Sequence, residues 1–307
     1  MTAIDLEDAV MFGTDVSEAL VDLADSARRS IVLVRSGQHG SGSGIVWSSD
    51  GTIMTNYHVV ARHTTATITT IDDRELRASV IATDPSLDLA VLRVDAADLP
   101  AARIGLSREV RIGELVMAVG NPWGRRGVAT LGIVSGVGEA QAPWRKEPSE
   151  YIRSDVMLAP GNSGGALLDM RGRVIGINAM IFGGDLSVAI PSDVATQFIS
   201  LAERRPMLGV GVRTVRLFSD VAKGVKQDRA LEVRELLADG PAATSGVVVG
   251  DLLLKLGGTL LTDSQSLRKA LEQHTRGARV ALDSIHNGAF VTRMIELQGL
   301  PKLERAA

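Results

Sequence analysis

Residues 155 to 178 read Asp155-Val-Met-Leu-Ala-Pro-Gly-Asn-Ser-Gly-Gly-Ala-Leu-Leu-Asp-Met-Arg-Gly-Arg-Val-Ile-Gly-Ile-Asn178, and this stretch decides the fold. Ser163 lies between glycines in a predicted turn, and two apolar runs lead away from it. Glycine adopts positive φ without a steric penalty and lets successive N–H groups converge on one point. We therefore expect the turn to hold Ser163 exposed, with the amides of Gly161 and Ser163 directed at a developing negative charge.

Short apolar runs separated by turn residues fill the sequence on both sides of the Ser163 turn. A first set comprises residues 31–35, 44–47, 52–55, 66–71, 76–82 and 89–94. After a polar interval, a second set comprises residues 114–119, 128–137, 150–158, 166–168, 173–178 and 186–190. Runs of this length between turn signals are typical of antiparallel strands. Two similar sets predict a mainly β protein with two packed barrels.

Helical periodicity marks the two ends of this β region. Residues 15–29 place Val16, Leu20, Leu23 and Ala27 on one face of a short amphipathic helix. A second helix begins at the capping pair Ser192-Asp193 and ends before Pro206, which gives the expected domain boundary. The domains predicted along the chain are residues 1–30, 31–205 and 206–300, followed by a tail at 301–307.

The region after Pro206 predicts a small α+β domain. Its apolar runs indicate strands near 208–215, 231–236, 251–256 and 279–297. Two helices are expected, a short one at 241–246 and a longer one at 264–274. Within the last strand stretch, Asn287-Gly288 is a strong signal for a hairpin turn.

Composition excludes several classes of function. A net charge of −3 without a basic block argues against a nucleic-acid partner, and the chain has no cysteine for disulfides, thiolate sites or cysteine nucleophiles. The histidines lack metal-ligand spacing, so no metal or other cofactor is expected. No run approaches the ~20 apolar residues of a membrane span, and the acidic start lacks the features of a signal peptide. As it stands, the chain is expected in the cytoplasm, or outside it if a leader was removed.

Two further residues complete a chemical pattern with Ser163. His58 follows the predicted strand 52–55, and Asp88 precedes the predicted strand 89–94. A serine hydroxyl needs a base to become a good nucleophile, and histidine changes charge near neutral pH. A carboxylate on the other ring nitrogen fixes the tautomer and stabilises the imidazolium. The order His, Asp, Ser is that of chymotrypsin-type enzymes, whereas esterases usually follow Ser, Asp, His. Asp84 and Asp95 remain alternative carboxylates.

The sequence resembles the HtrA (Deg) family of serine proteases over about residues 30 to 300. The motifs that match are 55–60 (Thr-Asn-Tyr-His-Val-Val), 88–92 (Asp-Leu-Ala-Val-Leu), 160–165 (Pro-Gly-Asn-Ser-Gly-Gly), 40–44, 120–124, 132–135, 174–178 and 189–191. This resemblance implies a chymotrypsin-like double β-barrel protease followed by a PDZ domain. The loop that binds peptide carboxylates in such domains corresponds to Met207, Leu208, Gly209 and Val210.

By this resemblance the protein is a serine endopeptidase that cleaves unfolded or damaged polypeptides in protein quality control. His58, Asp88 and Ser163 correspond to its catalytic residues, Gly161 and Ser163 to its oxyanion hole, and peptide C-termini to ligands of its PDZ domain. The alternative is a proteolytically weak chaperone or a peptide-binding scaffold. Side-chain preference at the cleavage site is expected to be small or branched apolar, because residues 155–160 and 177–190 offer no obvious buried acid.

Two departures from the family pattern affect regulation and assembly. The family usually carries a basic residue just after the stretch 132–135, whereas this chain has Glu139 there, with Arg145 as a candidate replacement. Family members also form trimers through aromatic residues in an N-terminal segment. Here only Phe12 is available, so the resemblance implies a homo-oligomer, with a trimer as the expected form.

Overall fold

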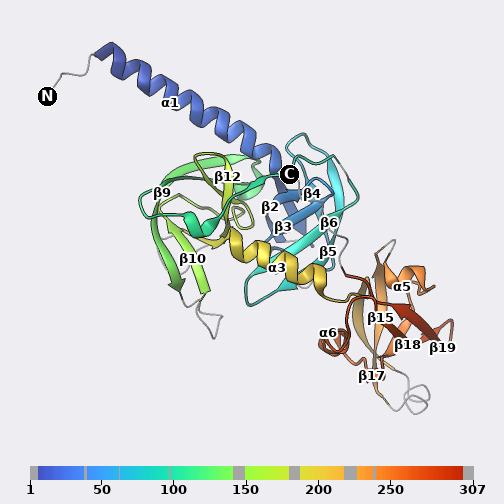
Figure 1. Ribbon diagram of the computed structural model, residues 1–307. Coiled ribbons are helices and arrows are strands. Elements are labelled where there is room, and N and C mark those ends of the chain that lie inside the picture. Colours follow the sequence, from blue (N-terminus) through green and yellow to red (C-terminus); the bar gives the residue numbers. More distant parts are fainter. Residues whose placement is uncertain are drawn as a thin grey trace. The chain divides into compact units, whose positions relative to one another are not determined.

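A computed structural model describes residues 6–37, 40–61, 63–96, 98–140, 149–179, 187–217, 227–237 and 240–299 (Figure 1). The chain divides into two compact units, Met1–Phe198 and Ile199–Lys302, and each has its own core. Two residues with predicted roles lie outside what the structure describes: the side chain of Phe12, predicted to take part in assembly, and Arg145, the candidate basic residue.

The first barrel contains all six strands predicted before residue 95. They are β1 (Ile31–Ser36), β2 (Gly40–Ser48), β3 (Thr52–Thr55), β4 (Thr65–Thr69), β5 (Glu75–Asp84) and β6 (Leu89–Val94). Each pairs antiparallel with its neighbours in the closed order β1-β2-β3-β6-β5-β4. The interior is filled by small and branched side chains, among them Val32, Val46, Ile53, Ile68 and Leu92.

The second barrel contains the six strands predicted after residue 113. They are β8 (Leu115–Gly120), β9 (Val128–Ala140), β10 (Ser149–Ser154), β11 (Ala166–Asp169), β12 (Arg173–Ala179) and β13 (Ser187–Pro191). The ring closes where β11 pairs with both β8 and β12. A seventh strand, β7 (Arg103–Ile104), runs parallel to β12. It was not predicted because two residues are too short to show an alternating pattern.

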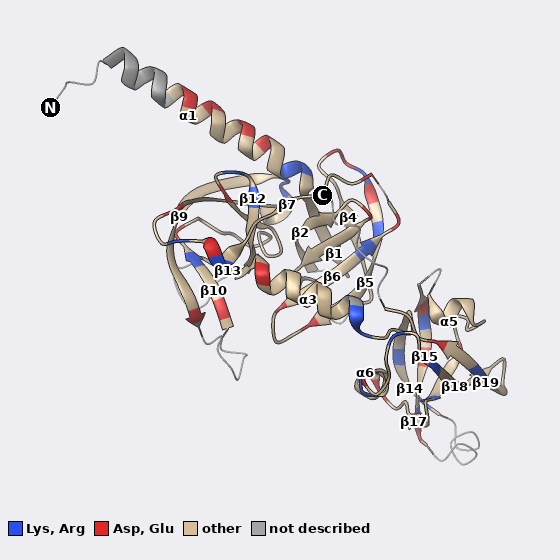
Figure 2. Cartoon of the chain, in the orientation of Figure 1, with Lys and Arg blue, Asp and Glu red and all other residues tan. Residues whose placement is uncertain are grey.

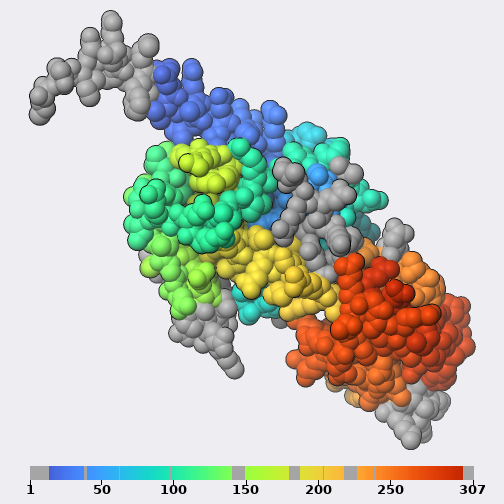
Figure 3. Space-filling model, viewed as in Figure 1, coloured from blue at the N-terminus to red at the C-terminus, as the bar shows by residue number. Residues whose placement is uncertain are grey.

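The N-terminal helix α1 (Leu6–Ala27) is longer than the predicted 15–29 and continues into the turn η1 (Arg28–Ser30). The prediction began at Asp15 because the apolar face used to predict the helix starts at Val16. In the structure the helix passes through Gly13, whose cost of about 1 kcal/mol in a helix is small enough to be overcome. Figure 3 shows α1 extending from the barrels, and residues 14–19 are exposed.

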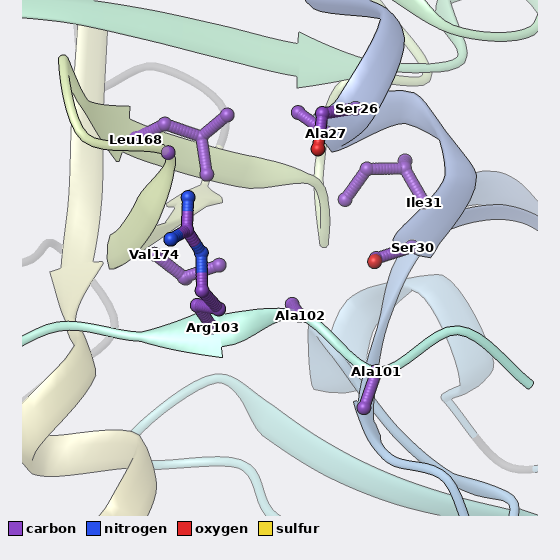
Figure 4. A pocket seen from close by; sticks show the side chains of 10 residues that line it. Ser26, Ala27, Ser30, Ile31, Ala101, Ala102, Arg103, Leu168 and Val174 are labelled. Atoms are coloured by element: carbon purple, nitrogen blue, oxygen red, sulfur yellow. The ribbon is translucent and has the colours of Figure 1, made fainter. Parts of the chain in front are cut away.

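Among the residues of α1 whose side chains are described, those in the last turns, such as Leu23, lie against the second barrel. A cavity of about 60 Å³ lies at this junction, lined by the end of α1, by η1 and by residues of strands and loops of the barrels (Figure 4). None of the predicted site residues lines it. Between Thr14 and Ala27 the helix carries four acidic residues and no basic one. Figure 2 shows acidic residues along this part of α1. Because none of the predicted site residues lines the cavity, it is separate from the candidate site.

The remaining predicted elements are present. Helix α3 (Ser192–Arg204) follows β13 and contains the point where the two units divide. The second unit has β14 (Val210–Arg216), β15 (Arg229–Leu236), α5 (Pro241–Thr244), β16 (Leu252–Leu256), β17 (Thr259–Leu260), α6 (Ser264–Glu272), β18 (Arg279–His286) and β19 (Ala289–Glu296). Asn287 and Gly288 both have positive φ, so they form the tight β18–β19 turn that their sequence predicts.

Candidate active site

Strand pairing in the first barrel brings His58 and Asp88 together. Thr55 at the end of β3 is paired with Ala90 at the start of β6, so the residues just beyond these two ends are neighbours. His58 lies in the single turn α2 (Tyr57–Val60), and its Nδ1 is 2.8 Å from Oδ2 of Asp88. The other carboxylate oxygen of Asp88 accepts the backbone N–H of His58 at 2.9 Å. Both oxygens of Asp88 therefore fix the position of the imidazole.

The backbone of Asp88 is itself held in an unusual conformation. Its φ is +54°, a left-handed value that a residue other than glycine seldom adopts. Two donors grip its carbonyl: the Asn56 side-chain amide at 2.9 Å and the Tyr57 N–H at 3.1 Å. The Asp88 side chain is 11% exposed and the His58 side chain 49%, so solvent reaches the imidazole more freely than the carboxylate.

The Ser163 loop starts with a type II turn from Ala159 to Asn162. The Asn162 N–H donates to the Ala159 carbonyl at 2.9 Å, Pro160 has the fixed φ suited to the second position, and Gly161 has the required positive φ of +105°. Trp123 donates its N–H to the Pro160 carbonyl at 2.9 Å. In a trans peptide the N–H points away from the carbonyl, so the Gly161 N–H is turned to the opposite side.

Every carbonyl from Pro160 to Ser163 accepts a hydrogen bond. The Gly161 carbonyl accepts a hydrogen bond from the Ser43 hydroxyl at 2.7 Å. The Asn162 carbonyl accepts the Gly165 N–H at 2.9 Å, and the Ser163 carbonyl accepts the Ser43 N–H at 2.7 Å. By contrast, the N–H groups of Gly161 and Ser163 have no acceptor among the described residues. Two unpaired amides beside a serine hydroxyl are the arrangement that stabilises an oxyanion.

Two features of Ser163 differ from expectation. The residue is only 4% exposed, because its loop packs closely on β2: a Cβ added to Gly164 would lie 2.1 Å from the Ser43 carbonyl oxygen. In addition, His58 and Ser163 share no hydrogen bond in the described part of the chain. This link in unliganded enzymes is often long and tightens when substrate binds.

The predicted walls of the primary pocket are partly described. Asp155 accepts the Ile133 N–H at 2.6 Å and is exposed, so it is not the buried acid that would select a basic side chain. Met157 is 77% exposed although its side chain is apolar. It lies in an irregular segment after β10, where no strand alternation turns it inward. Of the predicted wall 177–190, residues 180–186 lie outside the described residues.

The predicted carboxylate-binding loop lies at the start of β14. Gly209 has a φ of +75°, and the N–H groups of Leu208 and Gly209 donate to no acceptor in the described residues. Met207 forms an isolated antiparallel β-bridge with Gln298. Val210 begins β14, which forms one edge of its sheet. The Leu208 side chain is 1% exposed and belongs to the core of the unit, so it does not line an open pocket.

Several buried polar residues at the site lie in motifs that match the family, but the sequence did not predict what they contact. Each contacts a residue that is distant in sequence. Asn56 donates to the Asp88 carbonyl, Ser43 donates to the Gly161 carbonyl in the Ser163 loop, and Asn121 donates its N–H to the Ser43 hydroxyl. In the second unit, His286 at the end of β18 lies 2.7 Å from the buried Asp251, a contact that the sequence did not predict. Among the residues that the structure describes, no cluster of His, Asp and Glu could hold a metal ion. No helix in this described part is both long and apolar enough to cross a membrane.

Comparison with family models and known proteins agrees with this geometry. The model of the trypsin-like peptidase domain matches residues 42–177, and the PDZ domain model matches residues 206–297. A probable periplasmic serine endoprotease, DegP-like, from Pseudomonas putida (strain W619) is 38% identical over 270 residues, covering 85% of this chain and 56% of the relative. This chain therefore spans slightly more than half the length of such curated relatives.

Solved structures match over nearly their whole length. The HtrA-type protease AlgW with a tripeptide is 30% identical with a TM-score of 0.57, covering 92% of this chain and 97% of that one. The serine endoprotease from Yersinia pestis is 27% identical with a TM-score of 0.51, covering 91% and 98%. This chain is therefore similar to these proteins in both sequence and fold. The chain belongs to the HtrA family of serine proteases, with a trypsin-like peptidase domain followed by a PDZ domain.

Proposed function

We propose that this protein is a serine endopeptidase that cleaves unfolded or damaged polypeptides. Two observations carry the proposal. The carboxylate of Asp88 orients His58, and the N–H groups of Gly161 and Ser163 in the serine loop donate to no acceptor among the described residues. In this proposal Ser163 is the nucleophile, His58 the general base and then the general acid, and Asp88 the residue that orients His58. The amides of Gly161 and Ser163 form the oxyanion hole.

The proposed reaction follows from these positions. His58 takes the proton of the Ser163 hydroxyl as Oγ attacks the scissile carbonyl, and the carbonyl oxygen becomes an anion next to the two amides. When the C–N bond breaks, His58 gives its proton to the leaving amine. Water then hydrolyses the acyl-enzyme by the same steps in reverse order. Asp88 stays ionised throughout and stabilises the imidazolium.

Replacing the nucleophile tests the activity. Ser163→Ala should abolish cleavage of an unfolded protein such as casein and abolish labelling by a serine-directed phosphonate, because the attacking hydroxyl is lost. Circular dichroism should stay unchanged, since only one oxygen atom is lost from a loop. Ser49→Ala, at an exposed turn serine, is the matched control and should retain both activities. Cleavage by Ser163→Ala at the parent rate would contradict the proposal, and a parent that binds unfolded chains without cleaving them would favour the scaffold alternative.

The PDZ domain is proposed to bind the C-termini of peptides. Support comes from the unpaired amides of Leu208 and Gly209, from the edge position of β14 and from α6, which packs beside β14. A peptide can extend such a sheet edge while its carboxylate rests on the loop amides. We propose that small or branched apolar side chains are preferred at the cleavage site, since the described part of the predicted pocket wall contains no buried acid.

We also propose that the protein forms a homo-oligomer, a trimer in the expected form, in which α1 takes part. The apolar face of α1 is only partly covered, and Val16 remains 43% exposed. Removing residues 1–29 should therefore lower the mass measured by light scattering. The control Val21→Ser, at an exposed position off that face, should leave the mass unchanged. An unchanged mass after truncation, or a full-length monomer, would contradict this role.

We further propose a boundary at residue 206 and a location outside the cytoplasm. The boundary rests on the end of α3 at Arg204, and the location rests on the word periplasmic in the names of the relatives. Cell fractionation against a cytoplasmic marker enzyme distinguishes this location from the cytoplasmic one that the acidic N-terminal residues predict.

A further inference from the structure

Ser43 is a fully buried residue of β2 whose three polar groups all contact the Ser163 loop or its supports. Its N–H donates to the Ser163 carbonyl at 2.7 Å, and its hydroxyl donates to the Gly161 carbonyl at 2.7 Å. The same hydroxyl accepts the Asn121 N–H at 2.8 Å. Its carbonyl accepts the Thr55 hydroxyl at 2.6 Å. Every hydrogen-bonding group of Ser43 is therefore in use.

These bonds restrain a segment that would otherwise rotate easily. Gly161 and Gly164 both have positive φ, and glycine reaches many other conformations at little cost. The hydroxyl of Ser43 fixes the peptide after Gly161, and its N–H fixes the peptide after Ser163. Each of the two unpaired amides is thus followed directly by a peptide unit bound to Ser43. Rotation at Gly161 would have to break the hydroxyl bond first.

Ser43 also connects the two barrels at the site. It belongs to β2 of the first barrel, whereas Gly161, Ser163 and Asn121 belong to the second. Thr55 ends β3, three residues before His58. Through this one residue the loop of the nucleophile is tied to the strand that leads to the base.

We propose that Ser43 is a positioning residue for the oxyanion hole, and that its hydroxyl keeps the amides of Gly161 and Ser163 directed at the reacting carbonyl oxygen. This inference rests on the proposed protease activity. It assigns to Ser43 no contact with substrate, so its effect is expected in the transition state. Binding of the substrate in the ground state should change little.

Ser43→Ala removes the hydroxyl and keeps both backbone bonds. We expect kcat to fall about 10- to 100-fold, less than the 100- to 1,000-fold that follows outright loss of an oxyanion-hole donor. KM should stay within about twofold, the pattern of an interaction made only in the transition state. Binding of a peptide boronate, which forms a tetrahedral adduct, should weaken by a similar factor. Ser41→Ala, at an exposed serine on the same strand, is the matched control and should match the parent.

Titration with the phosphonate separates positioning from a loss of folded enzyme. In the positioning case all Ser43→Ala molecules are labelled, but more slowly; partial folding would give a reduced labelled fraction at the parent rate. If Ser43→Ala does not fold, Ser43→Cys keeps a weak donor of similar size and should give a smaller loss of kcat in the same pattern. A folded variant with kcat within about threefold of the parent, or an equal loss in Ser41→Ala, overturns the inference. A parent enzyme that neither cleaves nor reacts would instead overturn the proposed function.

Discussion

At the scale of single residues, the carboxylate of Asp88 has a defined task. It binds both the ring and the backbone of His58, whereas the alternative Asp84 uses its carboxylate on Ser86 and Leu87 in its own turn. The left-handed φ of Asp88 is tolerated best by Gly, Asn and Asp. The residue therefore combines a backbone shape and a charge that few side chains supply together.

Asp88→Asn should keep this backbone and lose the charge. We expect kcat to fall about 10⁴-fold, as the equivalent change does in a chymotrypsin-type serine protease, because the amide favours the wrong histidine tautomer. Cleavage of casein and circular dichroism measure the two effects separately. Asp84→Asn is the control and should stay near the parent rate. A loss below tenfold for Asp88→Asn would show that another group orients the base.

At the scale of elements, the β9–β10 hairpin contains an unfavourable pair. Glu139 on β9 is directly opposite Glu150 on β10, and both side chains are exposed. Like charges in this position destabilise a strand pair. This is also the position where the family usually carries a basic residue.

Glu139→Arg should replace this repulsion with attraction. We expect the free energy of unfolding to rise by roughly 0.2–1 kcal/mol, the range for opposite-charge pairs across strands. Glu139→Gln removes the repulsion alone and should give a smaller gain. Thermal unfolding at low and high salt tests the cause, because salt screens exposed charges. A gain that persists at 1 M salt would exclude a charge effect.

Most strands of the two barrels were predictable because they are short, largely buried apolar runs that turn residues separate. The stretches 52–55 and 89–94 also ended where His58 and Asp88 lie, so the order of the motifs and the strand ends together located these two residues. Other features leave no such pattern. Strand β7 has only two residues, and α1 begins nine residues before its predicted start at Asp15. Ser43 lies in the matching motif 40–44, but its contact with Gly161 could not be predicted because Gly161 is 118 residues away and only the packing of the two barrels brings them together.

At the scale of the whole molecule, the second unit has a core of its own and should work alone. Residues 206–299 should fold and bind peptides that end in an apolar residue with a free carboxylate, with a Kd on the order of micromolar. Amidation of the peptide C-terminus should weaken binding at least about tenfold, or about 1.4 kcal/mol, because the charge facing the loop amides is lost. Calorimetric titration of a matched acid and amide pair measures this. Equal affinities would show that the domain does not recognise C-termini.

The division of the site between two barrels has a consequence for the newly made chain. His58 and Asp88 emerge from the ribosome with the first barrel, but Ser163 and its amides follow only midway through the second, between β10 and β11. A nascent chain that has folded its first barrel holds a base without a nucleophile. Synthesis therefore completes most of this protease before it can cut anything, including its own unfolded sequence.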